Sequence, residues 1–179
     1  MYFCERMDMT ERNTNATSKR TIAKKEAFPE LIRDLKQDPK TQEMKQFIQH
    51  GTINTYDHCM DVAKCSYQLG ALLHLPVHEQ ELVRSAFLHD YYLYDWHHHE
   101  GRWHGYRHPK EAVQKADRDF ELSDLERNVI ESHMWPLTLR TLPHSREAVL
   151  VCIADKICSA RETLFCRKKS GTDHEQDKQ

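Results

Sequence analysis

Glycine and proline are scarce in this chain, and their scarcity limits the folds open to it. Only five glycines and six prolines occur in 179 residues. An all-β chain needs many turn residues, because its strands are bounded by turns in which glycine or proline sets the backbone. Apolar residues instead recur with a helical period through most of the chain, and no stretch alternates cleanly between apolar and polar residues. These patterns predict an all-α fold.

We expect about seven helices, packed into a compact bundle. Hydrophobic residues make up 39% of the chain, which is enough to enclose one core. Ser123 and Ser145 precede expected helices as N-cap residues, and Glu126 completes a capping box with Ser123. The expected helices cover residues 26–37, 41–49, 55–73, 79–91, 109–120, 124–134 and 146–167.

Polar segments flank the expected bundle and set its boundaries. Residues 1–25 and 167–179 carry few large apolar side chains, so burial there cannot offset the entropy lost on ordering. We therefore expect a flexible N-terminal arm over 1–25, a single helical domain over 26–166 and a flexible C-terminal tail over 167–179.

The charge balance and hydropathy narrow the classes of partner. The 26 Lys and Arg residues nearly balance 28 Asp and Glu residues, giving a net charge of −2. A global basic excess, typical of nucleic-acid or anionic-membrane binding, is absent, so neither partner is expected. No apolar run reaches the roughly 20 residues that a membrane-spanning helix needs. We expect a soluble, cytoplasmic protein that binds a small molecule, and we leave its oligomeric state open.

The six cysteines show no C-x-x-C pair, which argues against a thiolate zinc site. Four of them lie in apolar helical stretches, where a free thiol behaves as a small hydrophobic group. We expect all six to be reduced and structural: Cys4, Cys59, Cys65, Cys152, Cys158 and Cys166.

One segment, residues 91–106, interrupts the helical pattern. It is rich in aromatic residues, histidine and glycine, with no single apolar stripe, so we expect a loop. Aromatic side chains there, such as Trp96, Trp103 and Tyr106, are suited either to closing over a planar ligand or to packing the loop onto the bundle. The run His97–His99 is expected to be exposed and outside the catalytic set.

Six polar residues fall on helix faces that should be buried. His58, for example, begins an apolar row that continues through Val62, and His108 directly precedes Pro109 at the expected start of a helix. Any one such residue is more often an ordinary core residue than a ligand. The set is nevertheless unusual, since six share this placement: His58, His89, Asp90, His108, His133 and Asp155.

Buried carboxylates must be paired, hydrogen-bonded or bound to a metal. Imidazole and carboxylate ligands without thiolate suit iron, manganese, zinc or nickel. Six ligands exceed what one tetrahedral ion uses, which favours two ions that share a bridging carboxylate. The six residues therefore predict a binuclear metal site.

The order of these residues resembles the HD superfamily of metal-dependent phosphohydrolases, in its two-metal branch. The similarity covers roughly residues 51–161 and is carried by the segments TYDHCMDVAKCSYQLG, AFLHDYY, HPKEAV, ESHMWP and CIADKICSARE. It implies a helical bundle of the HD type. It also implies that His58, His89, Asp90 and Asp155 hold one metal ion, and that Asp90 bridges to a second ion held by His108 and His133.

The resemblance implies a hydrolase that cleaves a phosphate ester or phosphoanhydride of a small molecule, in our reading a nucleotide. Two divalent ions would supply metal-bound hydroxide, with His89 and Asp90 at the catalytic centre. Iron or manganese is the first expectation for the metal, and zinc, nickel, cobalt or magnesium are the alternatives.

The chain departs from many two-metal members at one point. Their His-Asp-Ile-Gly-Lys run, whose lysine helps to hold phosphate, is replaced here, with Tyr92 and Leu93 in the glycine and lysine positions. Other side chains must then contact the substrate, and the candidates are Trp103, Arg107, Lys110, Lys156 and Arg161.

Two alternative functions use the same predicted ligands. One is a di-iron oxygenase, as in an offshoot of the HD superfamily that cleaves carbon–phosphorus bonds, although the extra histidine of that offshoot is missing here. The other is a non-catalytic module that binds a nucleotide or a metal as a sensor. Dependence on oxygen and reduced iron, or binding without turnover, would distinguish these alternatives from a hydrolase.

Overall fold

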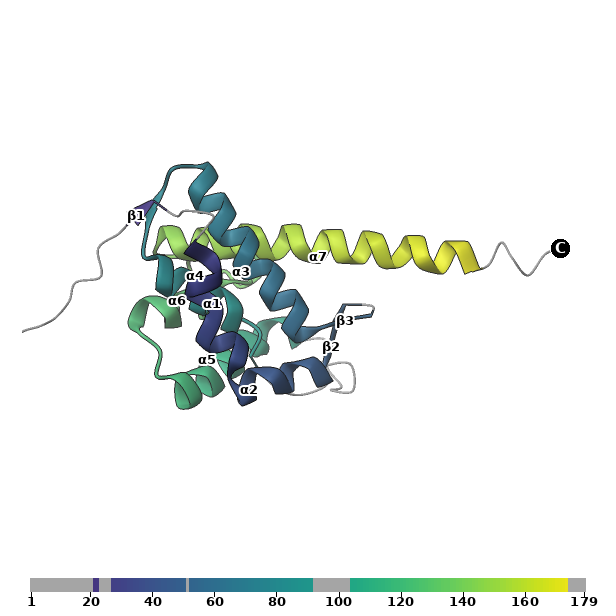
Figure 1. The fold of residues 1–179 in the computed structure, drawn as a ribbon, viewed down its shortest axis with the longest axis horizontal. Helices are drawn as coiled ribbons and strands as arrows, with labels where there is room; N and C mark the ends of the chain where they lie inside the picture. The colour runs from purple at the N-terminus through teal and green to yellow at the C-terminus, as the bar shows by residue number, and fades with distance from the viewer. Residues whose placement is uncertain (1–20, 23–26, 51, 92–103, 174–179) are drawn as a thin grey trace, which may run out of the picture.

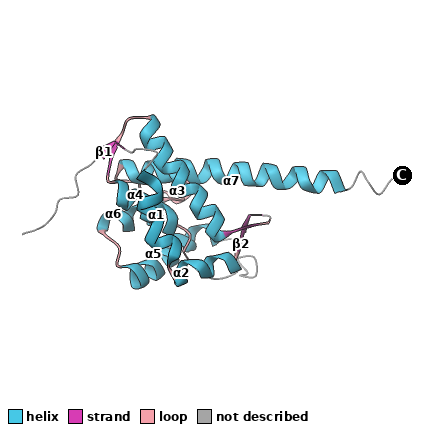
Figure 2. Ribbon diagram, in the orientation of Figure 1, coloured by secondary structure: helices cyan, strands magenta, loops and turns pink. Residues whose placement is uncertain are grey.

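The computed structural model describes residues 21–22, 27–50, 52–91 and 104–173, and the side chains of residues 27–49, 52–91 and 108–164. Helices dominate this part of the chain (Figure 2), which confirms the predicted all-α fold. The helices are α1 (Phe28–Gln37), α2 (Pro39–Gln42), α3 (Thr55–Leu72), α4 (Glu79–Leu88), α5 (His104–Phe120), α6 (Asp124–Ser132) and α7 (Arg146–Asp173), with a 3-10 helix η2 (Glu43–Gln46). The strands are β1 (Thr21–Ile22), β2 (Ile48–His50), β3 (Ile53–Asn54) and β4 (Pro76–Val77).

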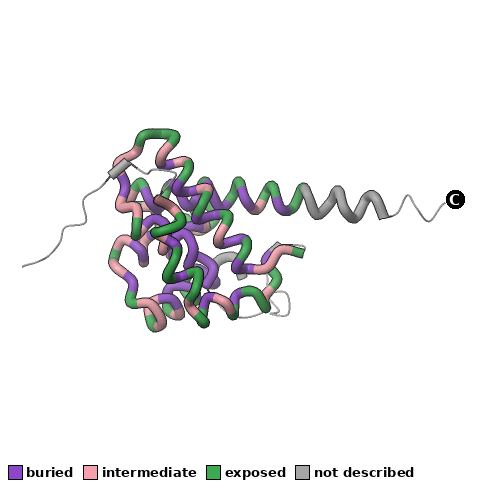
Figure 3. The backbone as a smooth tube through the Cα atoms, in the orientation of Figure 1, coloured by how far each residue is buried: buried purple, intermediate pink, exposed green. Residues whose placement is uncertain are grey.

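The bundle is built around α4. It packs against α3 and α6 and also contacts α1 and α7 (Figure 1). Leu82, Val83, Ala86 and Phe87 of α4 are fully buried, and the buried parts of the chain concentrate at this centre (Figure 3). None of the helices in the described ranges is long and apolar enough to cross a membrane.

The helix predicted over residues 41–49 is wrong in its second half. The 3-10 helix η2 ends at Gln46, and β2 then pairs antiparallel with β3, with Ile48 opposite Asn54. The Thr55 N–H donates a 2.8 Å hydrogen bond to the carbonyl of Phe47, which closes this hairpin against the start of α3. Pairing with a neighbouring segment therefore overrides the local helical preference.

Helix α7 is longer than predicted and projects beyond the other helices (Figure 1). It continues to Asp173, so the first part of the predicted tail over 167–179 is helical. At the other end of the chain, Thr21–Ile22 of the predicted arm over 1–25 form β1, which pairs with β4. The remainder of that arm lies outside the described residues.

The remaining helix boundaries shift in ways that matter for the predicted ligands. Helix α5 begins at His104, inside the segment predicted as a loop, so His108 and Pro109 lie within the helix rather than at its start. Proline lacks an N–H and thus removes only one hydrogen bond there, to the carbonyl four residues earlier. Helices α4 and α6 end earlier than predicted, which makes His89 and His133 their C-cap residues.

Candidate metal centre

The six predicted ligands lie together in the interior of the bundle. Each is at most 8% exposed, although they come from separate segments of the chain. The ring centroids of His58 and His89 are 5.4 Å apart, those of His89 and His133 are 4.9 Å apart, and those of His108 and His133 are 5.0 Å apart. The packing of α3, α4, α5, α6 and α7 thus brings four imidazoles and two carboxylates to one place.

Two of the imidazoles are oriented by the ends of their own helices. Nδ1 of His89 lies 2.8 Å from the carbonyl of Ala86, and Nδ1 of His133 lies 2.7 Å from the carbonyl of Ile130. The last carbonyls of a helix lack partners within the helix, so each ring N–H satisfies one of them. The same bond leaves Nε2 of each ring as the atom available to a metal.

The two carboxylate oxygens of Asp90 face different pairs of the four imidazoles. Its Oδ1 lies 3.4 Å from Nε2 of His108 and 3.4 Å from Nε2 of His133, and those two nitrogens are 2.9 Å apart. Its Oδ2 faces the other pair, 3.4 Å from Nε2 of His89 and 3.9 Å from Nε2 of His58. A single carboxylate therefore borders two separate groups of nitrogen atoms.

Asp155 completes the group on the Oδ2 side. Its Oδ1 lies 3.4 Å from Nε2 of His58 and 3.8 Å from Nε2 of His89. The hydroxyl of Ser159, one turn later on α7, donates a 3.2 Å hydrogen bond to the same oxygen. The ligand atoms of His58, His89 and Asp155 all lie within 4.8 Å of one another, as do those of His89, Asp90 and His133.

Two buried residues that the sequence analysis did not select hold the ligands in place. Both oxygens of Glu162 lie close to Nδ1 of His58, at 3.0 and 3.1 Å. Nε2 of Gln49 donates a 2.6 Å hydrogen bond to Oδ2 of Asp90. Glu162 lies seven residues after Asp155, so the helical period alone could have placed it on the same face. Gln49 carries no such signal, because it lies in β2.

The carboxylates and imidazoles shift one another's pKa values. Burial lowers the pKa of His58, but hydrogen bonds to Asp155 and Glu162 outweigh burial and raise that pKa to about 10. Burial likewise opposes protonation of His89, yet the charge of Asp90 raises its pKa well above the usual value.

The pKa values of His133, Asp90 and Asp155 shift in the opposite direction. Burial lowers the pKa of His133 to about 3, so this ring is neutral. Burial favours the neutral form of Asp90 and Asp155, but neighbouring imidazoles outweigh it, and the pKa of each carboxyl falls below the usual range. The centre thus holds ionised carboxylates that require nearby positive charge.

These residues fit a divalent metal. Nε2 of His89 and Oδ1 of Asp90 are buried and have no hydrogen-bond partner among the described residues. Two ligand atoms that each lie about 2.1 Å from one ion are roughly 3.0 to 3.4 Å apart at octahedral or tetrahedral angles. Most of the measured separations fall in or near this range, and imidazole with carboxylate is a common donor set for transition metals.

The residues predicted to contact the substrate lie less close together than the six predicted ligands do. Nζ of Lys156 donates a 3.0 Å hydrogen bond to the carbonyl of His133 and lies 3.9 Å from Oδ2 of Asp155, at the edge of the centre. Arg161 is exposed and pairs with Asp61 of α3, and Lys110 is exposed on α5. Two further predictions, Trp103 and the side chain of Arg107, lie outside the described part of the structure.

Comparison with known proteins identifies the family. The sequence profile of the HD domain matches residues 55–160, which is more than half of the chain and includes all six predicted ligands. Searches of curated proteins and of solved structures give no match. The HD domain is an all-α fold that binds divalent metals, in agreement with the bundle and with its buried histidine and aspartate clusters. The chain therefore belongs to the HD domain family, which is part of a superfamily of metal-dependent hydrolases.

Proposed function

We propose that this protein is a binuclear metal-dependent phosphohydrolase. The proposal rests mainly on Asp90, because its two carboxylate oxygens face different pairs of imidazoles. His58, His89, Asp90 and Asp155 would hold one ion, and Asp90, His108 and His133 would hold the second. Two ions held by these residues would supply Lewis acidity and would lower the pKa of bound water towards 7.

The protein's own residues prepare the centre for these ions. His133 is neutral because of burial, so its Nε2 needs to lose no proton before it binds a metal. Gln49 fixes the orientation of Asp90, and Glu162 fixes that of His58. The centre is enclosed by buried side chains, which lowers the local dielectric constant and strengthens each electrostatic interaction with a bound phosphoryl group.

For the substrate we propose a small phosphate ester or phosphoanhydride, with nucleotides as the first class to test. A pair of divalent ions binds phosphoryl oxygens directly, so the protein needs few cations of its own. Among the predicted cations whose side chains are described, Lys156 contacts the centre, since its Nζ donates to the carbonyl of His133 and lies 3.9 Å from Oδ2 of Asp155. Lys110, Arg107, Arg161 and Trp103 remain predicted contacts for the rest of the substrate.

Metal analysis combined with a phosphate-release assay tests the proposal. The full chain is purified without oxygen, its iron, manganese and zinc are quantified, and phosphate release is followed for nucleotides and simple phosphate esters. His89→Ala should lose both metal and activity, whereas His144→Ala, an exposed histidine outside the centre, should retain both.

The same assay separates the competing chemistries. Phosphate release that continues without oxygen supports hydrolysis. Turnover that requires oxygen and reduced iron would instead identify an oxygenase. Metal binding without turnover of any compound in the panel would contradict the enzymatic proposal and favour a binding module.

A further inference from the structure

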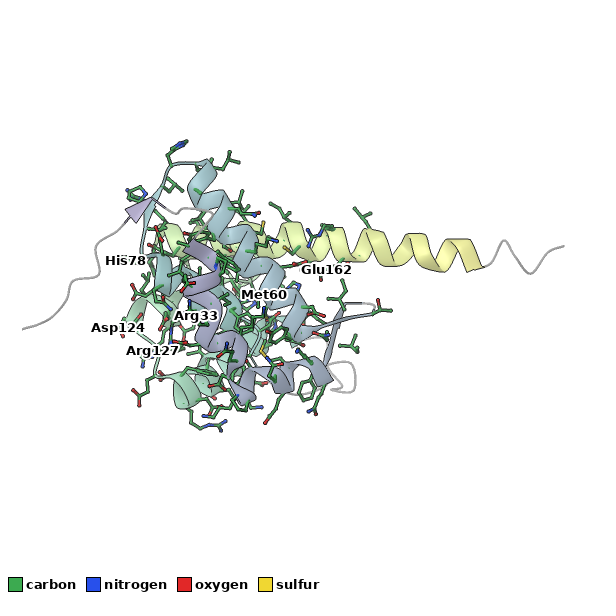
Figure 4. The ribbon with its side chains drawn as sticks, in the orientation of Figure 1. Arg33, Met60, His78, Asp124, Arg127 and Glu162 are labelled. Atoms are coloured by element: carbon green, nitrogen blue, oxygen red, sulfur yellow. The ribbon has the colours of Figure 1, made fainter. Side chains whose placement is uncertain are left out.

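Helices α3 and α7 run antiparallel, and their facing rows bring two cysteines together. Near one end His58 contacts Glu162, and Asp61 pairs with Arg161. Figure 4 labels Glu162 on α7 beside α3. Seven residues after His58 on α3 comes Cys65, and four residues before Glu162 on α7 comes Cys158. Because residues seven or four apart share a helix face, the two thiols face each other across the interface.

The two thiols interact with each other, and they differ in exposure. Cys158 is only 1% exposed, whereas Cys65 is half-buried. The interaction with the Cys158 thiol, together with the charge of Arg161, outweighs burial and lowers the pKa of Cys65 to about 7. The same interaction and burial raise the pKa of Cys158. Cys65 is therefore the more accessible and more acidic thiol of the pair, and Cys158 is the buried thiol beside it.

The other described cysteines lack these properties. Cys59 is fully buried, and Cys152 is 4% exposed with its thiol donating a 3.1 Å hydrogen bond to the carbonyl of Ser132. Burial raises the pKa of Cys152. All four described cysteines are free, as expected, and the accessibility of Cys65 beside Cys158 sets that pair apart from Cys59 and Cys152.

We propose that Cys65 and Cys158 are a redox-sensitive pair, which a hydroperoxide converts into a disulfide that joins α3 to α7. The Cys65 thiolate attacks one peroxide oxygen, an S–O bond forms, the O–O bond breaks, and the leaving hydroxide takes up a proton. Cys158 then loses its proton and attacks the Cys65 sulfur, so that an S–S bond forms and water leaves. Two thiols lose two electrons, and hydrogen peroxide is reduced to two molecules of water.

The sequence makes this pairing easy to detect. Trypsin cleaves after lysine and arginine, so Cys65 falls in the peptide 65–84 and Cys158 in the peptide 157–161, and each contains no other cysteine. Cys59 and Cys152 fall in the separate peptides 46–64 and 147–156. The full chain is treated with hydrogen peroxide, its remaining thiols are alkylated, and the digest is examined by mass spectrometry.

We expect a peptide pair joining 65–84 to 157–161, which disappears on reduction with dithiothreitol. Cys65→Ser should lower the oxidation of Cys158 at least tenfold. Cys158→Ser should leave Cys65 as a sulfenic acid that dimedone traps, and Cys152→Ser, on the same helix, should leave the linked pair unchanged. The linked pair should also form after a chelator removes metal, because the chemistry uses only the two thiols and the peroxide.

Several results would overturn the proposal. One is that peroxide oxidises Cys59 or Cys152 as fast as Cys65, and another is that Cys65 becomes linked mainly to a cysteine other than Cys158. Loss of the disulfide after metal removal would show that a bound metal, rather than the thiol pair, drives the oxidation. The unmodified chain gives each of these readings, so none depends on the folding of a variant.

Discussion

Nδ1 of His58 lies 3.0 Å from a carboxylate oxygen of Glu162, although 104 residues separate the two in the chain. Both side chains are buried. The contact holds the imidazole so that its Nε2 faces Asp90 and Asp155. A carboxylate that accepts the second N–H of a metal-binding histidine fixes its tautomer and raises its basicity. Glu162 therefore supports the centre without being one of the predicted ligands.

Removing Glu162 should weaken metal binding. We expect Glu162→Ala to lower the affinity by about 10- to 100-fold, the usual effect of losing such a partner. Glu162→Gln keeps a hydrogen-bond acceptor and should lose less. Competition with a chromophoric chelator measures the affinity, and Glu43→Ala, at an exposed position, is the control. An unchanged affinity in Glu162→Ala would contradict the positioning role.

If Asp90 joins two metal positions, they should be separable by mutation. His133→Ala should reduce the metal content to one ion per chain, because it removes a ligand on the Oδ1 side of Asp90 only. Asp90→Asn should deplete both positions, since both use this carboxylate. Elemental analysis of the purified variants checks this, with His144→Ala as the control. Full metal content in Asp90→Asn would argue against a bridge.

Gln49 should matter although it belongs to a short strand outside the bundle. Its side chain donates a 2.6 Å hydrogen bond to Oδ2 of Asp90 and accepts one from Thr55. A hydrogen bond to a charged group contributes about 1.5 to 3 kcal/mol, so Gln49→Ala should weaken metal binding roughly tenfold or more. Gln46→Ala, on the exposed side of η2, should have no effect. Equal affinities of the two variants would show that Asp90 needs no such support.

Metal binding should release protons and strengthen as the pH rises. Burial lowers the pKa of His58, but Asp155 and Glu162 raise it to about 10, so this ring is protonated at neutral pH without metal. A metal must displace that proton, and the apparent affinity should increase about tenfold per pH unit for each proton released. Calorimetry in two buffers with different ionisation enthalpies counts the protons. A heat of binding that is the same in both buffers would contradict the prediction.

The stability of the metal-free protein should show the opposite trend. The folded pKa of His58 exceeds the ordinary value of 6.5, so its stabilising contribution is complete below pH 6.5 and is lost as the pH rises towards 10. Thermal unfolding of chelator-treated protein should therefore occur at a lower temperature at pH 9 than at pH 7. Glu162→Gln should reduce this difference, because it removes one of the two carboxylates that raise the pKa.

The start of α6 offers a stability test away from the metal centre. Glu126 is buried, accepts a 2.6 Å hydrogen bond from Nε of Arg84, and forms a capping box with Ser123. Glu126→Ala should lower the free energy of unfolding by about 3 kcal/mol, since it leaves Arg84 without this partner. Ser123→Ala should cost about 1 kcal/mol.

Asp124 provides the matched control for α6. It lies one residue after Ser123, is fully exposed, and pairs with Arg127 at the surface (Figure 4). Exposed pairs contribute little, so Asp124→Ala should leave the urea midpoint nearly unchanged. A loss as large as that of Glu126→Ala would show that the helix dipole, rather than the partly buried Arg84–Glu126 ion pair, dominates at this helix end.

Most of the helices could be identified from the sequence, and so could the six candidate ligands, whereas the second half of the helix predicted over 41–49 and the start of α5 could not. Helical hydrogen bonds join residues four apart, so a row such as the one from His58 through Val62 indicates which helix face will be buried. The position of Asp155 within a buried face follows from the same rule. The hairpin of β2 and β3 does not, because its pairing depends on a neighbouring segment rather than on a local period.

By itself, the sequence determined the helical class through the spacing of its apolar residues, and it carried the motifs that match the HD domain family and that contain the clustered histidines and aspartates. Only the tertiary structure decided how they are paired: which imidazoles face each oxygen of Asp90, and that Gln49 and Glu162 hold the ligands. Those relationships join residues far apart in the chain. They depend on the angles and distances at which helices pack, which the period of a single helix does not contain.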